Sequence, residues 1–538
     1  MAALLSALMI VRLYCLAEYD DKTAAVLSGQ YSRCADVMSR SGFVFDRNGF
    51  LISHTQSGMA AIVDPTAVGD KDRDKIAEAL SENGQASFSE IISKLEERAP
   101  FTVSLEKAPD GLSDAEGIYL FPLYEQEHGP FLRHVLGYRD GDGNGRSGIY
   151  EKYGGVLSDL GGSVYYTYTS DAAGNIRGPD GFTVSNDGYA EEGEYDSGLL
   201  LTIDKAIQET VDEVCEEKLD MGAVVICDVN TGELLAVSSR PLYDDENIAL
   251  SLESDRGELI NRAFSRYTPG SVFKSVVAAA ALEYDMELYG FEYECTGSLD
   301  VSGQIFRCHD HSGHGVQSMC EAYANSCNTY FISLAFEIGL DTIYQTARKM
   351  GLGDAYAIDG LFVSGAVLPE NKPVYPPAYL ANISFGQGDL MVSPIDILNV
   401  TCICSANRKH SFSLVKGIRM GEVYEEYEKK EPQKVLSDET AAKMREMMRE
   451  CAESGTGRSA CAESVDVGVK TATAQSGQFR DGQELLHRWV AGVFPIDEPK
   501  YALVVLCDGN GEGSASPGEI FGEIAERVWK IDSGKGRK

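Results

Sequence analysis

The stretch SVFKSVVAAAALEYDM occupies residues 271–286, directly after the turn signal Tyr267-Thr268-Pro269-Gly270. Its Ala- and Val-rich composition predicts a buried helix, and the turn places Ser271 at the helix N-terminus. Unpaired backbone N–H groups and the positive end of the helix dipole favour negative charge at that position. Lys274 follows one turn later on the same face, where its amine can reach the Ser271 hydroxyl and where apolar neighbours disfavour the ammonium form. The stretch therefore predicts a nucleophilic serine with a neutral lysine as its general base.

A second group, Ser326-Cys327-Asn328, decides how the first is interpreted. Taken alone, a Ser followed three residues later by Lys is common and indicates a helix cap and a solvated lysine. Ser326 and Asn328 are two residues apart, which directs both side chains to one side of a loop or an extended segment. One can relay a proton while the other donates an amide hydrogen bond. Cys327 between them is interpreted as a small buried residue, not as a nucleophile.

A third group, Lys470-Thr471-Ala472-Thr473, follows the apolar run 465–469, which has strand character. On such a strand Lys470 supplies positive charge and Thr471 a hydroxyl for a substrate carboxylate. The backbone N–H of Thr473 becomes a second oxyanion donor beside that of Ser271. The three groups together are therefore a set of parts for nucleophilic attack on an amide.

In this order the three groups resemble the Ser-x-x-Lys, Ser-x-Asn and Lys-Thr-Gly motifs of penicillin-binding proteins and serine β-lactamases. The chain resembles in particular the class B penicillin-binding proteins, the monofunctional peptidoglycan transpeptidases. The resemblance covers nearly the whole chain, and further matching segments are Asp46-Arg47-Asn48-Gly49, Leu201-Thr202-Ile203-Asp204, Gly386-Gln387-Gly388, Ser454-Gly455-Thr456-Gly457 and Trp489-Val490-Ala491-Gly492. It implies a D,D-transpeptidase that cross-links stem peptides through a serine acyl-enzyme, is acylated by β-lactams and uses no cofactor.

The resemblance also implies a role for each site residue. Lys274 takes the proton of Ser271, which attacks the carbonyl between the two terminal D-alanines of a stem peptide. The N–H groups of Ser271 and Thr473 hold the oxyanion. Ser326 passes a proton to the departing amine, and Asn328 orients both the substrate amide and Lys274.

The remaining implied roles belong to the third group. Lys470 and Thr471 bind the terminal carboxylate, and the positive charge of Lys470 helps to keep Lys274 neutral. Ala472 stands where the family usually has Gly, and its methyl group is expected to narrow the slot beside the acyl chain. This departure is expected to alter substrate fit and antibiotic sensitivity more than the chemistry.

Sequence patterning alone predicts an α+β fold. Strands are expected at 223–228 and 233–238, as a hairpin, and at 489–493 and 501–508, with a closing helix at 520–531. The resemblance adds an antiparallel sheet with helices on both faces and a helical subdomain that carries the first two groups.

The resemblance also divides the chain into four parts. They are a membrane anchor at 1–18, an elongated α+β pedestal or dimerisation domain at 19–198, a transpeptidase domain at 199–532 and a disordered tail at 533–538.

The N-terminal segment indicates where the protein is located, and the net charge of the chain limits its possible partners. Residues 1–17 are apolar apart from Ser6 and Arg12, slightly short of the about 20 residues that a membrane span needs. We interpret them as part of a membrane anchor, with a cleaved or vestigial signal as the alternative, which predicts a single-pass protein with its catalytic domain outside the cytoplasmic membrane. The formal net charge of −36 argues against nucleic acid as a partner. The expected partners are peptidoglycan stem peptides, β-lactams, the membrane, a glycosyltransferase and other cell-wall proteins.

Two other clusters carry metal-ligand residues. Residues 140–151 match the spacing of an EF-hand loop, although Ser147 stands where such loops are usually apolar. The other cluster has soft ligands suited to zinc, which are Cys295, Cys308, His309, Asp310, His311, His314 and Cys320. Its spacing fits no standard zinc finger, so the sequence favours ordinary packing or a Cys295–Cys308 disulfide, and no metal is predicted.

The chain contains many cysteines. Thirteen cysteines are many for an exported domain, which indicates an anaerobic source or several buried free thiols.

Two alternative functions would use some of the same residues. A serine β-lactamase-like hydrolase would use the same three groups but needs a base for a deacylating water. A β-lactam-binding sensor or scaffold would not need Ser326, Asn328 and Lys470, so their presence favours an enzyme.

Overall fold

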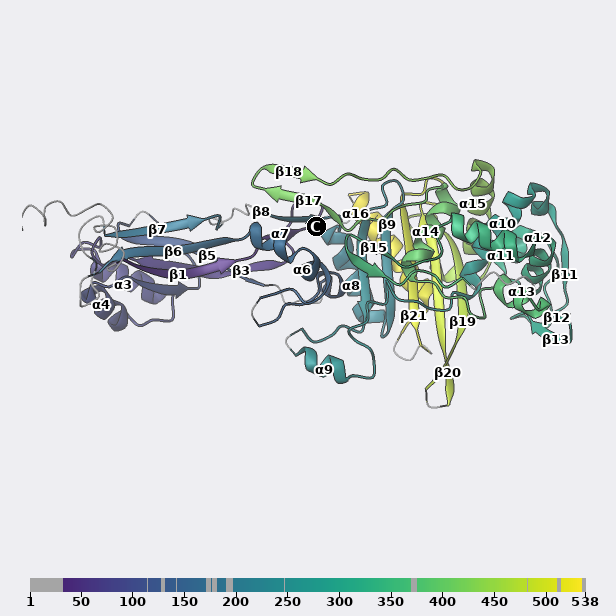
Figure 1. The fold of residues 1–538 in the computed structure, drawn as a ribbon, viewed down its shortest axis with the longest axis horizontal. Helices are drawn as coiled ribbons and strands as arrows, with labels where there is room; N and C mark the ends of the chain where they lie inside the picture. Colours follow the sequence, from purple (N-terminus) through teal and green to yellow (C-terminus); the bar gives the residue numbers. More distant parts are fainter. Residues whose placement is uncertain are drawn as a thin grey trace, which may run out of the picture.

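The computed structural model describes residues 32–534 apart from 114, 127–130, 142, 171–175, 177–180, 190–196, 246, 369–374, 481 and 510–513. The predicted anchor at 1–18 and residues 535–538 of the predicted tail lie outside the described residues. No helix in the described ranges is both long and apolar enough to cross a membrane. Figure 1 shows an elongated molecule in which an N-terminal domain, a central sheet and a helical subdomain follow one another along the long axis.

The central sheet of the C-terminal domain is antiparallel and has the strand order β10-β9-β21-β20-β19. Its strands are β9 Gly222–Asp228, β10 Leu234–Arg240, β19 Gly468–Arg480, β20 Gln483–Phe494 and β21 Tyr501–Asp508. The inner strands β9 and β21 and the edge strand β10 are buried along almost their whole length, and the apolar runs of β9 and β21 agree with this burial. The predicted hairpin and the two predicted C-terminal strands are confirmed.

Helices cover both faces of this sheet, as the predicted α+β fold requires. Helices α8 Lys205–Lys218 and α16 Pro517–Asp532 pack against each other and on one face, and α14 Pro394–Ala406 packs on the other. Helix α15 Asp438–Glu453 packs on α14 and on β19. The closing helix predicted at 520–531 is therefore confirmed as α16.

The helical subdomain is built around a buried helix rich in Ala and Val. Helix α10 Lys274–Tyr284 is buried from Lys274 to Leu282 and packs against α12 Asn328–Lys349. The other elements here are η2 Met286–Gly290, α11 Met319–Ala324, α13 Pro377–Ser384 and the strands β11 Tyr293–Cys295, β12 Ser298–Val301, β13 Gln304–Arg307 and β14 Gly315–Gln317. The prediction of one helix from Ser271 was wrong at its start, because the 3-10 turn η1 Gly270–Phe273 precedes α10.

The N-terminal domain has its own core. Strands β3 His54–Val63, β4 Phe101–Leu105 and β5 Ile118–Gln126 form a sheet, and α3 Arg73–Glu82 and α4 Phe88–Glu97 share one apolar cluster with it. Strands β1 Ser32–Arg40, β6 Gly162–Thr169 and β7 Phe182–Asp187 form a second sheet. Further short elements are α5 Arg133–Leu136, α6 Gly148–Lys152, α7 Gly154–Asp159, α9 Ile248–Glu253, η3 Arg458–Ala460, β15 Tyr356–Ile358 and β16 Leu361–Val363.

The two domains are joined by a shared sheet with the order β18-β17-β8-β2. Strand β2 Phe43–Phe45 pairs in parallel with β8 Ser197–Leu201, and β8 pairs with β17 Val415–Met420, next to β18 Val423–Glu426. The predicted boundary at 198/199 lies within β8, so one strand belongs structurally to both domains.

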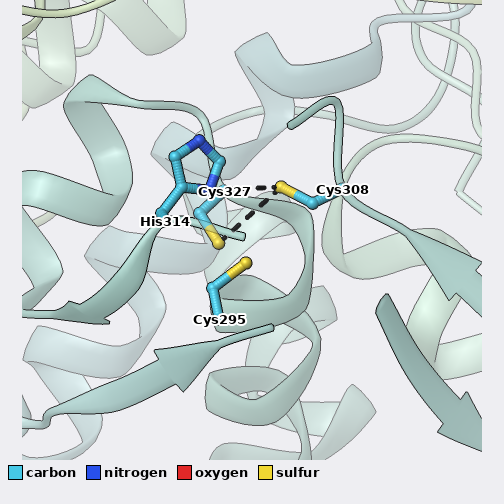
Figure 2. A group of neighbouring side chains, drawn as sticks. All are labelled: Cys295, Cys308, His314 and Cys327. Carbon is cyan, nitrogen blue, oxygen red and sulfur yellow. Dashed lines mark hydrogen bonds between the residues drawn. The ribbon is translucent and has the colours of Figure 1, made fainter. Parts of the chain in front are cut away.

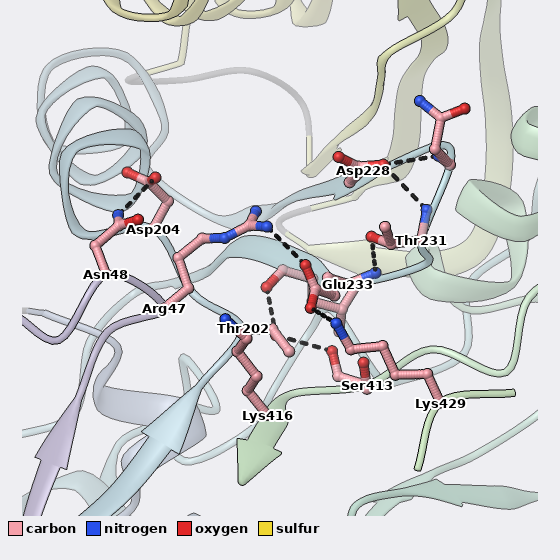
Figure 3. Close-up of polar contacts among 12 residues, drawn as sticks. Arg47, Asn48, Thr202, Asp204, Asp228, Thr231, Glu233, Ser413, Lys416 and Lys429 are labelled. Carbon is pink, nitrogen blue, oxygen red and sulfur yellow. Dashed lines mark hydrogen bonds and ion pairs between the residues drawn. The ribbon is translucent and has the colours of Figure 1, made fainter. Parts of the chain in front are cut away.

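A buried carboxylate strengthens this junction (Figure 3). Glu233, 1% exposed, accepts from Arg47 Nη2 at 2.7 Å and from Lys429 Nζ at 2.5 Å. Beside it, Asn48 Nδ2 donates to Asp204 Oδ2 at 3.2 Å. The Asp46-Arg47-Asn48-Gly49 segment thus connects the N-terminal domain to the β9–β10 hairpin and to the start of α8.

Candidate active site

Ser271 lies in η1 and lines a pocket of about 810 Å³ between β19 and the helical subdomain. The turn is held from two sides, because Gly270 N donates to Gly386 O at 2.9 Å and Trp489 Nε1 donates to Thr268 O at 3.1 Å. Gly270 has a φ of +55°, a left-handed conformation that glycine adopts without steric cost. The sequence Tyr-Thr-Pro-Gly therefore presents Ser271 from a tight, anchored turn.

Lys274 is fully buried, one residue beyond η1. Its Nζ donates to the backbone oxygen of Ser326 at 2.6 Å, to Ser326 Oγ at 3.3 Å and to Asn328 Oδ1 at 2.8 Å. Among the described residues it makes no hydrogen bond to the Ser271 hydroxyl, which differs from the sequence prediction. Burial, and then the positive charge of Lys470, lower the pKa of Lys274 well below its usual value.

Ser326 and Asn328 lie at the junction of α11 and α12, where sequence reasoning expected a loop or an extended segment. Ser326 has a φ of +54°, which is uncommon for a residue other than glycine and typical of functional sites. Asn328 is the first residue of α12, and its Nδ2 donates to Arg307 O at 3.1 Å. The sharp turn at Ser326 brings both polar side chains to Lys274.

Lys470 reaches the Ser326 hydroxyl from strand β19. It is 1% exposed on β19, and its Nζ donates to Ser326 Oγ at 3.1 Å and to Thr471 O at 3.0 Å. Burial lowers the pKa of Lys470 as well. Within the described ranges neither Lys470 nor Lys274 has a carboxylate within 4.0 Å, so no carboxylate offsets the burial of the two amines.

The remaining predicted residues, Thr471, Ala472 and Thr473, line the pocket from β19. Thr471 Oγ1 lies 2.6 Å from Thr456 Oγ1. Ala472 is paired with Trp489 in the sheet register, and its methyl group lies close to the turn, 3.5 Å from where a Cβ on Gly270 would stand. The methyl group that departs from the family pattern therefore lies beside the turn that carries Ser271.

The pocket also contains residues to which sequence reasoning assigned no role. Thr456, Arg307 and Arg488 line it. Thr456 lies in a segment that was noted only as a family match, and Arg488 is paired with Thr473 in the register of β19 and β20. For Thr456 and Arg488, the signal in the sequence was their position. Thr456 lies in a segment that matches the family, and Arg488 lies across the sheet from the third motif.

The metal and disulfide expectations have different outcomes. Both Cys295 and Cys308 are free thiols, so the expected disulfide between them is wrong. All twelve cysteines in the described ranges are free and most are buried, which agrees with the expectation of several buried free thiols.

In the EF-hand-like segment at 140–151, Asp142 lies outside the described residues, and the Asp140 carboxylate accepts a hydrogen bond from Arg146 Nε at 2.7 Å.

The family described as the penicillin binding protein transpeptidase domain matches residues 222–526, more than half of the chain. The chain belongs to this family. It is 28% identical over 515 residues to stage V sporulation protein D of Bacillus subtilis, an alignment that covers 91% of this chain and 77% of that protein. It is 25% identical over 541 residues to the peptidoglycan D,D-transpeptidase MrdA of Acinetobacter baumannii, with 88% and 78% covered.

Solved structures of penicillin-binding proteins share the fold of both domains. The complex between PBP2 and MreC from Helicobacter pylori has a TM-score of 0.65 at 20% identity and covers 93% of this chain and 100% of that chain. Penicillin-binding protein 3 from Mycobacterium tuberculosis, complexed with aztreonam, has a TM-score of 0.65 at 20% identity and covers 93% and 97%. The family match and the named relatives show a class B penicillin-binding protein, as the three motifs predicted.

Proposed function

We propose that this class B penicillin-binding protein cross-links peptidoglycan stem peptides through an acyl-enzyme on Ser271. The observation that carries the proposal is the convergence of two buried amines, those of Lys274 and Lys470, on the Ser326 hydroxyl in the pocket that Ser271 lines. Burial and the neighbouring charge favour the neutral form of Lys274, which can then accept a proton.

In the acylation step, Lys274 Nζ accepts the Ser271 proton while Ser271 Oγ bonds to the carbonyl carbon of the penultimate D-alanine. The backbone N–H groups of Ser271 and Thr473 hold the oxyanion. Strand β19 is the edge of its sheet and contacts η1, which supports the assignment of Thr473, because an edge strand has backbone groups that no neighbouring strand uses.

The leaving group then receives its proton from Ser326. The C–N bond breaks, the terminal D-alanine departs as an amine with the Ser326 proton, and Lys274 returns its extra proton to Ser326. Ser326 Oγ lies within hydrogen-bond distance of both amines, at 3.3 Å from Lys274 and 3.1 Å from Lys470, which supports this relay. Asn328 holds Lys274 in place and presents its amide to the substrate.

In the second step an amine of a neighbouring stem peptide attacks the ester carbonyl of the acyl-enzyme. The acceptor proton returns through Ser326 and Lys274 to Ser271 Oγ, so the new amide forms and the enzyme is regenerated. A β-lactam enters as a substrate mimic, and because its amide is part of a ring, no leaving group departs after acylation.

The pocket charge supports a substrate that carries carboxylates. Although the whole chain has a net charge of −36, the described residues that line the pocket include Arg307 and Arg488 and no Asp or Glu. Lys470 and Thr471 are placed to bind the terminal carboxylate. The absence of an acidic side chain from this lining also argues against a hydrolase whose deacylating water needs a carboxylate base.

We place this activity outside the cytoplasmic membrane, on a single-pass protein with a pedestal at 19–198 and a transpeptidase domain at 199–532. A glycosyltransferase and other cell-wall proteins are the proposed partners. The similarity to a PBP2 that was crystallised with MreC supports a cell-wall protein as a partner class.

The first experiment is covalent labelling with a fluorescent penicillin. Ser271→Ala is expected to abolish labelling, whereas Ser265→Ala is expected to label normally, because within the described part of the chain Ser265 Oγ bonds only to the backbone oxygen of Asn261. Equal labelling of wild type and Ser271→Ala would refute the acyl-enzyme. Turnover of a stem peptide with an added amine acceptor then separates the two reactions, since a hydrolase would release only the trimmed peptide.

A further inference from the structure

Four metal-ligand side chains converge behind the active site (Figure 2). They are Cys295, Cys308, His314 and Cys327, and their ligand atoms all lie within 4.8 Å of one another. The three cysteines are 2%, 1% and 0% exposed, and His314 is half-buried. Three of these residues belong to the cluster that the sequence indicated, whereas Cys327 comes from the second catalytic motif.

The distances agree with a tetrahedral zinc site. Zn–S bonds of about 2.3 Å and Zn–N bonds of about 2.0–2.1 Å place two sulfurs about 3.8 Å apart and a sulfur and a nitrogen about 3.6 Å apart. Cys308 Sγ lies 3.9 Å from Cys327 Sγ and 3.5 Å from His314 Nδ1. The side chains thus stand at ligand spacing and not at the spacing of a disulfide bond.

The four come from the end of β11, from both ends of the loop between β13 and β14, and from the start of α12, and tight turns bring these segments together. Cys295 ends β11, Cys308 follows β13, His314 precedes β14, and Cys327 is the N-cap residue of α12. At Gly297, φ is +89° and a Cβ would stand 2.2 Å from His311 O, and at Gly313, φ is +86° and a Cβ would stand 2.3 Å from Cys295 O. Only glycine permits this close approach of the two loops.

Backbone N–H groups face all three sulfurs. Those of Gly297 and His314 face Cys295, that of Asn328 faces Cys308, and that of Tyr330 faces Cys327. Such donors stabilise the thiolates that a metal requires and orient the ligands around it.

Another thiol pair in this chain shows what packing alone produces. Cys227 Sγ lies 3.5 Å from Cys402 Sγ in the core of the C-terminal domain. Within the described part of the chain no third cysteine, histidine or carboxylate joins that pair to make a group of three ligands. The cluster at Cys327 therefore differs from it in ligand number and in ligand type.

We propose that Cys295, Cys308, Cys327 and His314 bind one structural zinc ion. Binding exchanges the three thiol protons for Zn²⁺, which leaves a net charge of −1 on the ion with three thiolates and neutral imidazole. Four protein ligands complete the coordination sphere, which is typical of structural and not of catalytic zinc.

The position of Cys327 gives the ion a positioning role in acyl transfer, an inference that rests on the proposed function. Cys327 lies between Ser326 and Asn328, whose three acceptors hold the Lys274 amine. The other three ligands belong to the β11–β14 segment of the helical subdomain. The zinc ion thus ties this segment to the second motif and holds Ser326 in its left-handed conformation.

The site itself is tested by metal analysis of the full chain, purified under reducing conditions and dialysed after addition of ZnSO4. We expect about one zinc per chain, lost in Cys308→Ser and in the Cys308→Ser, His314→Ala double variant. Cys320→Ser is the matched control, because Cys320 lies on α11, between His314 and Cys327 in the chain but outside the cluster, and it should retain the ion. Zinc far below one equivalent in the wild type, another metal in its place, or equal zinc in all variants would overturn the site.

A second measurement does not depend on variants that fold. Wild-type protein loaded with Co²⁺ is expected to show the sulfur-to-cobalt charge-transfer and intense visible bands of a tetrahedral thiolate site. A weak spectrum of octahedral type would overturn the proposed ligand set.

The positioning role is tested by the rate of β-lactam acylation. Removal of zinc with a chelator is expected to slow acylation about tenfold or more, and added Zn²⁺ should restore it. An unchanged rate in zinc-free protein would overturn the positioning role. Ser271→Ala is expected to lose acylation but to keep its zinc, so a failure of the proposed function and a failure of the metal site give different results.

Discussion

At the residue scale, the site depends on the protonation of two buried lysines. The pKa of Lys274 is lowered by burial and by the charge of Lys470, so the folded chain binds fewer protons here than the unfolded chain at any pH between the lowered value and 10.5. The contribution of Lys274 to the free energy of unfolding therefore increases as pH rises through that window. Burial of this amine costs stability at pH values below this window and supplies a general base above the lowered pKa.

This coupling predicts the pH dependence of acylation. The rate of β-lactam acylation is expected to rise with pH along a limb set by Lys274, with its midpoint below 10.5. Lys470→Met removes the neighbouring charge, so the midpoint should move to higher pH and the rate at neutral pH should fall about tenfold or more.

The control for this measurement is Arg488→Met, which removes another cation from the pocket lining. It is expected to change the plateau of the rate and to leave the midpoint in place. A midpoint that does not move in Lys470→Met would show that Lys470 does not set the charge state of the base.

At the scale of elements, the nucleophile is positioned by backbone contacts between segments far apart in the chain. Gly386, with a φ of +77°, accepts a hydrogen bond from Gly270 N, and a Cβ added to it would lie 2.0 Å from Gly270 O. The Gly386-Gln387-Gly388 segment thus fixes η1 by close backbone approach, which explains why its first position is glycine.

Gly386→Ala should therefore displace η1 and Ser271. We expect a lower thermal midpoint and an acylation rate reduced about tenfold or more. Gly339→Ala is the matched control, because its φ of +76° also lies in a conformation that favours glycine, while nothing lies within 4 Å of its added Cβ. If both variants acylate at the same rate, backbone contact with Gly386 does not position the nucleophile.

At the scale of the whole molecule, the two domains are joined by the sheet β18-β17-β8-β2 and by the ion pair of Glu233 with Arg47. The carboxylate is almost completely buried, whereas its partners Arg47 and Lys429 are 25% and 39% exposed. Arg47 comes from the N-terminal domain, so its pair with Glu233 opposes separation of that domain from the central sheet, whereas Lys429 pairs with Glu233 within the C-terminal domain.

Glu233→Ala is expected to lower the free energy of unfolding by about 2 kcal/mol, less than for a fully buried pair because solvent screens the two cations. Urea unfolding followed by tryptophan fluorescence measures this, since both tryptophans lie in the C-terminal domain. Asp70→Asn removes an exposed ion pair with Arg73 and should change the value by less than about 0.5 kcal/mol. Similar losses in the two variants would contradict a stabilising role for the buried carboxylate.

Much of the fold was predictable because its signals are local. The apolar runs of β9 and β21 and the capped, amphipathic pattern of α16 are properties of consecutive residues, and these elements were predicted within a few residues. The start of α10 was not, because η1 results from contacts of Gly270 with Gly386 and of Thr268 with Trp489, which lie more than a hundred residues away.

By itself, the sequence determined the family, the α+β architecture and the order of the three motifs, because residue types at fixed spacing along one chain are sufficient for these. Only the tertiary structure decided that Lys274 bonds to Ser326 and Asn328, and that Cys327 stands with Cys295, Cys308 and His314. Both arrangements depend on the left-handed turn at Ser326. The direction of a side chain after such a turn follows from packing between distant segments, which neither periodicity nor spacing encodes.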